Sequence, residues 1–489
     1  MLVFWILLLL LGLFTFSTVQ QSVGAITRTP VWLLWLVMMM PALVLAGWAI
    51  IQGPEKPMPM GILLGLFILC PLLYWGLVQW GRKPGMPPTA PAQTSQVKGE
   101  PAPTKPPLRP IDKEEETALQ GCFPWSVYYL QTIEYLPQAM ICRGQLRTSP
   151  TEAYDTVRDN VRQQFGDRFL VIFQEGMQGK PIFALVPNPK AQAQGQAKPL
   201  TRPGLAVGLL LLTLITTTAA GVGLMGLTEA QWEADPSLLW QGLPYALALM
   251  LILGCHEMGH YLTARRYRMD ATLPYFIPVP FFLGTFGAFI QIRSPVPHRR
   301  ALFDVGMAGP LAGLVVTVPL LLWGLAQSTV VPMPEEGSGL LSFEAISPTA
   351  SVLLALMIKL TLGSQMGLDQ AVHLHPVAIA GCLGLVVTAL NLMPVGQLDG
   401  GHIVHAMYGQ RVGAIIGQVS RLLVLVLAFV HSELLIWAIL LFFIPAVDQP
   451  ALNDISELDS PRDLLGLIAL TLLVLIVLPL PGPFARLLF

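Results

Sequence analysis

Residues 238–264 read LLWQGLPYALALMLILGCHEMGHYLTA, an apolar run long enough to span a membrane, with two histidines and a glutamate near its end. In a helix, positions i and i+4 share a face, so His256 and His260 can hold one metal ion. Glu257 lies one position further round the helix and can reach a water molecule bound to that ion. Ionisable side chains are costly within a membrane and usually mark a functional site. The run predicts a metal centre inside the membrane; the alternative is two histidines that bond only to neighbouring helices.

The composition places most of the remaining chain in lipid as well. Of 489 residues, 54% are hydrophobic and 12% are charged, about half the ~25% of a soluble domain, and the mean hydropathy is +0.62. These values exclude a disordered chain, a nucleic-acid binder and an ordinary cytosolic enzyme. The five cysteines lack the paired spacing of a disulfide framework or of a cysteine-based zinc site.

We expect a polytopic α-helical membrane protein with about eight to ten spans, since roughly 20 apolar residues cross the ~30 Å core of a bilayer. Residues 411–447 form either one long broken element or a tight pair of helices. Ser351–Gly363 is interpreted as a partly inserted or interfacial helix on the outer side. The first run has no Lys or Arg before Arg28, so we expect a membrane helix there and no cleaved leader. The predicted spans lie near 2–24, 31–51, 60–80, 203–226, 238–264, 303–326, 374–393 and 463–481.

One charged segment interrupts this apolar chain, because residues 82–202 hold 26 of the 57 charged side chains. Within it we expect a small α+β soluble domain inserted after the third span, with a strand-like stretch at Tyr128–Leu146, a helix at Pro150–Phe165, and strands at Phe169–Phe173 and Pro181–Val186. The predicted parts of the chain are a three-helix membrane region 1–81, a Pro-rich linker 82–118, the α+β domain 119–190, a second linker 191–202, a membrane core 203–447, and a cytoplasmic loop with a C-terminal membrane helix at 448–489.

The distribution of Lys and Arg predicts the orientation in the membrane, since positive charge collects on the cytoplasmic side. That side is expected to hold Arg28, the Arg82–Lys83 pair and the cluster of Arg265, Arg266 and Arg268. The soluble domain is then cytoplasmic, and the N-terminus lies outside.

A catalytic zinc site needs a third protein ligand besides two histidines. Asp399 qualifies, within Asn391-Leu392-Met393-Pro394-Val395-Gly396-Gln397-Leu398-Asp399-Gly400-Gly401, because it follows an apolar span at a similar depth in the membrane. Pro394 ends that span, and the glycines allow the backbone to approach closely. The alternative for Asp399 is a polar loop residue that caps a helix starting near His402.

The two motifs together, HEMGH and NLMPVGQLDGG about 130 residues later, resemble the site-2 proteases over roughly residues 203–447. These are intramembrane zinc metalloproteases, and the glycine-containing segments 284–288 and 306–313 agree with that family. In the soluble region, Cys142–Arg147 is similar to the GNLR signature of the plant and cyanobacterial EGY branch, with Gln145 in place of the Asn. The three extra apolar spans, where plant members carry a transit peptide, point to a bacterial protein of a cyanobacterial inner or thylakoid membrane.

The resemblance implies a zinc metalloprotease that hydrolyses peptide bonds of transmembrane or membrane-anchored protein substrates, in regulated intramembrane proteolysis. His256, His260 and Asp399 would bind one Zn2+ per chain, and Glu257 would act as the general base. Asn391 would donate a hydrogen bond to the substrate or its oxyanion; the alternative for it is an interhelical hydrogen bond. The competing functions are an ion or solute transporter and a non-catalytic membrane scaffold. No nucleic-acid partner is expected.

Tyr275–Arg293 is apolar, rich in Pro, Gly and Phe, and flanked by arginines assigned to one side, which predicts a re-entrant segment. A substrate helix must open before hydrolysis, so we expect the edge around Thr285–Phe289 to pair with the unwound substrate as an added strand. The alternative is ordinary helix packing through small residues.

Two weaker patterns have simpler interpretations. The spacing of Gly309 and Gly313 favours close packing of two helices. Four histidines outside the HEMGH motif indicate either a second metal or, more simply, loop and supporting roles; they are His373, His375, His402 and His405.

Overall fold

The computed structural model shows two compact units, Met1–Thr104 and Lys105–Phe489. The structure describes most residues from 111 onward and some of the residues before 111. The described positions before residue 111 are 27, 29–52 and separate residues within 12–20 and 65–81; the gaps after it are 137–138, 177–178, 189–190, 192–201, 228–230, 232–233, 280–282, 333–345, 364–365, 368 and 431–433.

The first unit contains the helix α2 (Val31–Gln52), at the position of the second predicted span. Trp35 holds this helix to an earlier part of the chain, since its Nε1 donates to the carbonyl oxygen of Gly12 at 2.8 Å. The first and third predicted spans, 2–24 and 60–80, lie largely outside the described residues.

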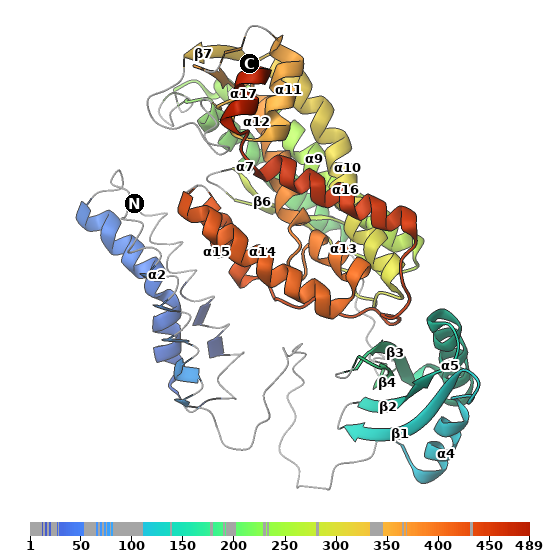
Figure 1. Ribbon diagram of the computed structural model, residues 1–489. Helices are drawn as coiled ribbons and strands as arrows, with labels where there is room; N and C mark the ends of the chain where they lie inside the picture. The colour runs from blue at the N-terminus through green and yellow to red at the C-terminus, as the bar shows by residue number, and fades with distance from the viewer. Residues whose placement is uncertain are drawn as a thin grey trace. The chain divides into compact units, whose positions relative to one another are not determined.

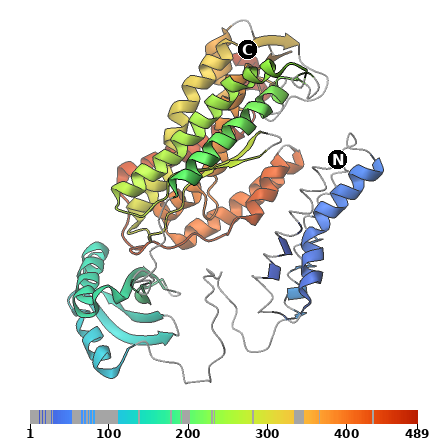
Figure 2. The ribbon, with the colours of Figure 1, turned by 180° about the vertical axis from the view of Figure 1, so that it is seen from behind.

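The second unit has a body of apolar helices. Helix α9 packs against α7, α10 and α12, and α10 also packs against α13. Seen from behind, α7, α9 and α10 lie side by side as green to yellow ribbons (Figure 2). The helices are α7 (Pro203–Leu224), α9 (Leu243–Arg266), α10 (Arg299–Ala326), α11 (Val352–Leu362), α12 (Pro376–Leu392), α13 (Asp399–Tyr408), α14 (Gln410–Val430), α15 (Leu435–Phe443), α16 (Ser460–Val477) and α17 (Gly482–Leu488).

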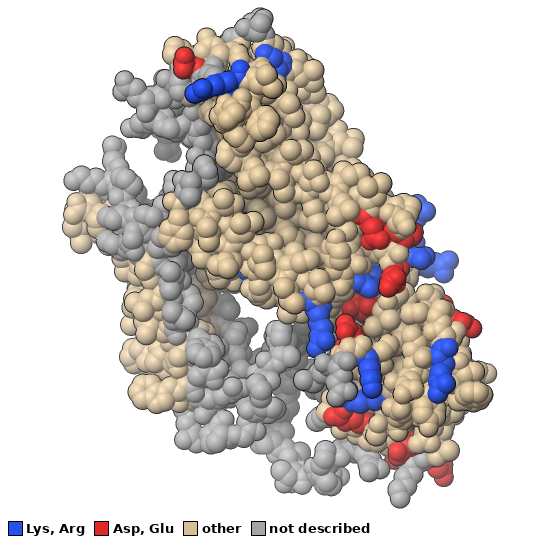
Figure 3. Space-filling view, in the orientation of Figure 1, with Lys and Arg blue, Asp and Glu red and all other residues tan. Residues whose placement is uncertain are grey.

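Six helices of the described chain are long and apolar enough to cross a membrane, judged by length and composition. They cover 31–48, 203–224, 236–266, 299–326, 410–429 and 460–477, while α11 and α12 are shorter apolar helices. For residues 411–447 the sequence predicted either one long broken element or a tight pair of helices. The structure has two helices there, α14 and α15. On the face drawn in Figure 3, charged side chains gather at the two ends of the helical body and leave its long sides uncharged.

Residues before the helical body form a four-stranded antiparallel sheet with strand order β1-β2-β4-β3 (Figure 1). Its strands are β1 (Tyr128–Leu136), β2 (Ala139–Leu146), β3 (Phe169–Glu175) and β4 (Pro181–Pro187). The stretch expected to be strand-like at 128–146 is therefore a hairpin, in which Leu136 pairs with Ala139. Two helices accompany the sheet, α4 (Lys113–Gly121) and α5 (Pro150–Phe165).

Both helices of this small domain begin at polar caps. The hydroxyl of Ser149 accepts a hydrogen bond from the backbone of Glu152 at the start of α5, whose buried residues Ala153, Val157 and Val161 share one face. A capping box of Asp112 and Glu115 starts α4. This helix lies partly within the predicted linker 82–118, because its first turn carries three glutamates and no apolar residue to mark it.

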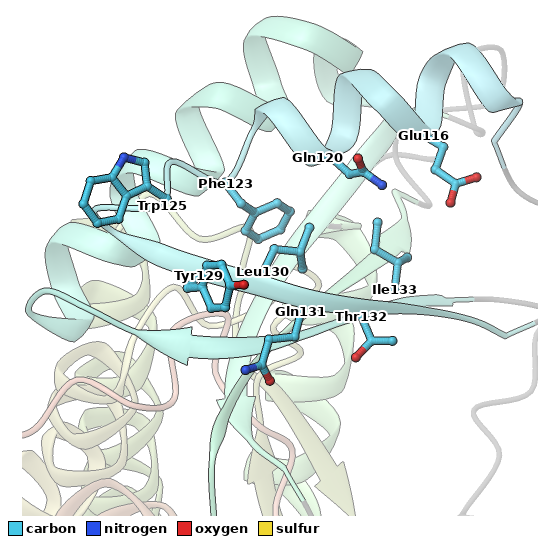
Figure 4. A pocket seen from close by; sticks show the side chains of 9 residues that line it. All are labelled: Glu116, Gln120, Phe123, Trp125, Tyr129, Leu130, Gln131, Thr132 and Ile133. Atoms are coloured by element: carbon cyan, nitrogen blue, oxygen red, sulfur yellow. The ribbon is translucent and has the colours of Figure 1, made fainter.

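Helix α4 and the edge strand β1 enclose a pocket (Figure 4). Glu116 and Gln120 line it from the helix, and Leu130 and Ile133 line it from the strand. The aromatic ring of Trp125 stands at one end of the pocket and is 74% exposed. The small domain thus has an aromatic, partly open surface on the side of β1.

Two short two-stranded sheets accompany the helical body. Strands β5 (Tyr275–Pro278) and β6 (Thr285–Phe289) pair antiparallel, and β7 (Thr329–Pro332) pairs with β8 (Gln370–His373). At the β5–β6 turn, Gly284 has φ +79, and a Cβ there would lie 2.4 Å from Cα of Thr217 in α7. Only glycine therefore allows this hairpin to approach α7 so closely.

Candidate metal centre

Helix α9 presents three polar side chains of the HEMGH motif inside the helical body. The helix starts with a proline in its first turn and ends with Arg265 and Arg266, where cations favour the helix C-terminus. His256 is 4% exposed, Glu257 9% and His260 8%. Three buried ionisable residues on an otherwise apolar helix require partners from neighbouring elements.

Asp399 of α13 is one of these partners. Its Oδ2 lies 3.3 Å from Nε2 of His260 and 3.5 Å from Nε2 of His256, and the two Nε2 atoms are 3.2 Å apart. Among the described residues, these three form the one group of His, Cys, Asp or Glu side chains close enough to hold a metal ion. The structure thus brings together the three residues that the sequence selected as ligands from motifs far apart in the chain.

The separations between these three atoms suit a tetrahedral zinc ion. Protein ligands lie about 2.0–2.2 Å from zinc, which places neighbouring ligand atoms of a tetrahedron about 3.3 Å apart. The observed separations of 3.2, 3.3 and 3.5 Å agree with that spacing. Two imidazoles and one carboxylate are also a donor set that a catalytic zinc site uses, with a fourth position left for water.

A backbone carbonyl orients the second histidine. Nδ1 of His260 lies 2.8 Å from the carbonyl oxygen of Val305 in α10, which can only accept a hydrogen bond. The ring proton therefore sits on Nδ1, and the lone pair of Nε2 faces His256 and Asp399. The sequence carried no signal for this contact, because a backbone oxygen can come from any residue type.

Glycines of α10 form the wall against which both histidine rings lie. A Cβ at Gly309 would come 2.0 Å from Nε2 of His260, and one at Gly313 would come 3.2 Å from Nδ1 of His256. The sequence predicted close helix packing at these two glycines but gave no indication that their neighbours are the histidine rings. Small residues on α10 thus leave the room that the metal centre occupies.

A tight loop carries the chain from α12 to Asp399. Helix α12 ends at Leu392, and Asp399 is the first residue of α13. Gly400 permits this turn, since a Cβ there would lie 1.9 Å from the carbonyl oxygen of Leu392. The residue at the N-cap of α13 is Leu398, which makes no side-chain cap, while the Asp399 carboxylate faces the histidines.

Asn391 and Glu257 complete the surroundings of the candidate centre. Nδ2 of Asn391 lies 3.2 Å from Nε2 of His256, so this amide points into the site from the last turn of α12. Glu257 lies close to the backbone of Ile290, the residue after β6. The chain that follows the strand expected to hold substrate is therefore next to the expected general base.

The other histidines have separate structural contacts. His375 caps α12 by accepting a hydrogen bond from the backbone of Val377 at 3.3 Å. His402 and His405 both bond to Asp448, which lies more than 40 residues further along the chain. Sequence reasoning did not find Asp448, because no motif or periodicity links it to α13.

Comparison with known proteins identifies two parts of the chain. The model of peptidase family M50 matches residues 244–431, and the model of the EGY3 middle domain matches residues 117–194. The first contains the candidate metal centre, and the second covers the small α+β domain.

The chain is also similar to three kinds of plant protein, each named a probable chloroplastic zinc metalloprotease. It is 29% identical to EGY2 of Oryza sativa subsp. indica over 366 residues, which cover 74% of this chain and 65% of the relative. It is 34% identical to EGY1 of Oryza sativa subsp. japonica over 375 residues, covering 71% and 63%. For EGY3 of the same subspecies the identity is 25% over 387 residues, covering 74% and 64%. No solved structure matches the chain.

Residues 244–431 therefore form a domain of peptidase family M50, the family of the site-2 proteases, in a chain with several helices long and apolar enough to span a membrane. The match to the EGY3 middle domain and the similarity to EGY1 and EGY2 support the EGY-like branch that the sequence signature predicted. The chain spans just under two thirds of the length of the EGY relatives it matches. Those relatives are chloroplastic plant proteins and not bacterial ones, so they do not support the bacterial origin expected from the sequence.

Proposed function

We propose that this protein is a zinc-dependent protease that hydrolyses peptide bonds of transmembrane or membrane-anchored protein substrates within the bilayer. The observation that carries the proposal is that Asp399 of α13 meets His256 and His260, with Glu257 beside them, at a helix long and apolar enough to span a membrane. The match of residues 244–431 to peptidase family M50 and the names of the EGY relatives support it. The transporter and scaffold alternatives gain no support from the comparisons.

His256, His260 and Asp399 would hold one Zn2+ per chain. Bound zinc supplies a Lewis acid that polarises a carbonyl and lowers the pKa of water. Glu257 acts as the general base, taking a proton from the attacking water and returning it to the leaving amine. Asn391 donates its amide hydrogen to the oxygen on which negative charge develops. The five side chains come from the three helices α9, α12 and α13.

The substrate strand is assigned to the free edge of β6. Among the described residues, β6 pairs with β5 on one side only, so its other edge still offers backbone donors and acceptors. Phe286 on this strand is 72% exposed. We infer that the segment around Tyr275–Arg293 enters the membrane from one side, and that an unwound substrate adds to β6 as a third strand.

Proline scanning across residues 285–289 tests this edge. A proline whose missing N–H faces the substrate should reduce cleavage at least tenfold while zinc content stays at the wild-type level. Normal cleavage by every variant in the scan would exclude strand addition at β6 and favour simple packing of this segment.

We further propose that the α+β domain at 119–190 is soluble and cytoplasmic, and that the membrane is a bacterial inner or thylakoid membrane. The Arg265, Arg266 and Arg268 cluster at the end of α9 supports the cytoplasmic assignment of that side. Helix α11, with 11 residues, is too short to span alone and is assigned to the outer surface. A reporter fused after Gly367 should therefore report an outside location, and a cytoplasmic signal would refute the orientation.

Metal analysis of the detergent-purified protein tests the central proposal. The wild type should bind about one zinc per chain, and both His256→Ala and Asp399→Ala should lose it. His373→Ala, which changes an exposed histidine on β8, is the matched control and should keep its zinc. Glu257→Gln should keep zinc, lose cleavage and trap bound substrate. A wild type without metal after chelator-free purification and zinc addition would overturn the protease assignment.

A further inference from the structure

His405, in the last turn of α13, lies buried between two carboxylates. Its Nδ1 is 2.8 Å from Oδ2 of Asp448, and its Nε2 is 2.9 Å from Oδ1 of Asp454. His405 is 1% exposed, and the two aspartates are 8% and 7% exposed. An ionised carboxylate only accepts hydrogen bonds, so both ring nitrogens must donate and the ring is an imidazolium.

The other charged and titratable groups around His405 come from two further positions. Nδ1 of His402, one turn earlier on α13, lies 2.8 Å from the same Asp448 oxygen. Arg299, at the start of α10, donates from one guanidinium nitrogen to the carbonyl oxygen of His405 at 3.2 Å. His405, Asp448, Asp454 and Arg299 are buried, while His402 is partly exposed. Removing one of the buried charges leaves others without a counter-charge.

This cluster holds α13 to the segment that connects α15 and α16. Asp448 and Asp454 both belong to residues 448–456, which we name the clamp segment. Helix α13 is ten residues long, with Asp399 as its first residue and His405 in its last turn. A helix this short moves as one piece, so a constraint on His405 is a constraint on the carboxylate of Asp399.

The clamp segment is also held by the small domain. The backbone of Phe173 in β3 donates to Leu452 at 2.6 Å, and the backbone of Asp454 donates back to Phe173 at 2.8 Å. Leu452 and Ile455 pack against the apolar core of that domain. On its other side, the backbone of Leu452 donates to Val296, just before α10, at 2.8 Å. One segment therefore contacts the small domain, α10 and α13.

We propose that His405 is a positioning residue for the metal ligand Asp399, and that the clamp segment couples the small α+β domain to the metal centre through it. Releasing the clamp removes no zinc ligand but lets α13 shift, so Asp399 spends less time at the distances that suit zinc. The proposal rests on the proposed function, because it takes Asp399 to be a ligand.

Zinc affinity of the full-length protein, measured by competition with a chelator, tests this role. His405→Gln and Asp454→Asn should each weaken zinc binding about 10- to 100-fold, as loss of a group that supports a metal ligand typically does. Asp454→Glu keeps the charge and should recover most of the affinity. His373→Gln, an exposed histidine outside the cluster, should bind zinc like the wild type.

Hydrogen–deuterium exchange supplies a readout that does not depend on metal. In the metal-free protein, Asp454→Asn should speed exchange in 399–408 and 448–456 and leave β7 and β8 unchanged. Wild-type zinc affinity in Asp454→Asn, which alters the least volume, would overturn the proposal even if His405→Gln failed to fold. If the wild type itself bound no zinc, the proposed function would fail, while exchange would still show whether the clamp holds α13.

Discussion

A methyl group at residue 309 would lie 2.0 Å from Nε2 of His260, the atom that faces His256 and Asp399. Two heavy atoms cannot approach so closely, so only glycine fits against this ring. His260 cannot retreat without losing the hydrogen bond between its Nδ1 and Val305. The geometry of the candidate metal centre therefore depends on Gly309 of α10 as well as on the three ligand residues.

Gly309→Ala should weaken zinc binding at least about tenfold, because overpacking costs about 1–3 kcal/mol and here displaces a ligand. The matched control is Gly223→Ala in α7, where a Cβ would meet nothing within 4 Å. Chelator competition on both variants checks the prediction. Equal zinc affinities would show that α10 can move away from His260 without cost.

Asn391→Ala should lower kcat about 10²- to 10³-fold, the usual loss when one donor to a developing oxyanion is removed. Zinc content should remain at the wild-type level, because the amide is not one of the three ligands. Single-turnover cleavage of a defined substrate with metal analysis measures both. A kcat within twofold of the wild type would instead support the alternative role, in which Asn391 only bonds between helices.

Arg462→Lys should lower the melting temperature by several degrees. Arg462 donates to both oxygens of Asp304, at 2.7 and 2.8 Å, and to Asp459 at 2.6 Å, which joins α16 to α10. A lysine ammonium cannot reproduce this fork, and lost bonds to charged partners cost about 1.5–3 kcal/mol each. Arg162→Lys, on an ion pair of the small domain whose side chains are 70% and 69% exposed, should change the melting temperature little.

The stability of the metal-free protein should fall as the pH rises through about 9. Burial opposes charge on His405, but its hydrogen bonds to Asp448 and Asp454 outweigh burial and raise its pKa from 6.5 to about 9. A raised pKa means that this contribution is complete below pH 6.5 and is lost as the ring deprotonates. Melting curves from pH 6 to 10 check this, with His405→Gln expected to show a smaller alkaline loss. Parallel curves for the two proteins would contradict it.

The same cluster predicts a loss of stability at acid pH. Burial opposes charge on Asp448 too, but His402 and His405 outweigh it and lower the pKa of this carboxyl from 3.8 to about 2. Its contribution is therefore present above pH 3.8 and is lost as the pH falls through about 2. In Asp448→Asn, the melting temperature should fall less steeply at acid pH than in the wild type. If the fall is unchanged, the loss of stability at acid pH comes from other carboxylates.

Local patterns in the sequence predicted much of the site and of the small domain. The i, i+4 spacing of His256 and His260 requires only a helix, and the break at Pro394 marks Asp399 because few aspartates follow a span so closely. Residue patterns also predicted α5 at Pro150–Phe165 with the bounds that the structure has. In each case the physical cause acts over a few residues and is visible in the chain itself.

Contacts between distant segments could not be predicted in this way. His405 meets Asp454 only because the chain returns to α13 after α14 and α15, and nothing near either residue marks the pairing. The start of α4 at Lys113 is different, since the capping box of Asp112 and Glu115 is present in the sequence. It went unrecognised because a Pro-rich run up to Pro110 precedes it and the first turn is all polar.

The position of the clamp segment along the chain sets an order of events during synthesis. The small domain ends at Pro187 and can fold early, but residues 448–456 leave the ribosome more than 250 residues later. At about 5–20 residues per second, that interval is on the order of 10 to 50 s. All three ligand residues of the candidate centre are made within this interval, before the clamp segment. A newly made chain therefore acquires its metal ligands first and the connection to its small domain last.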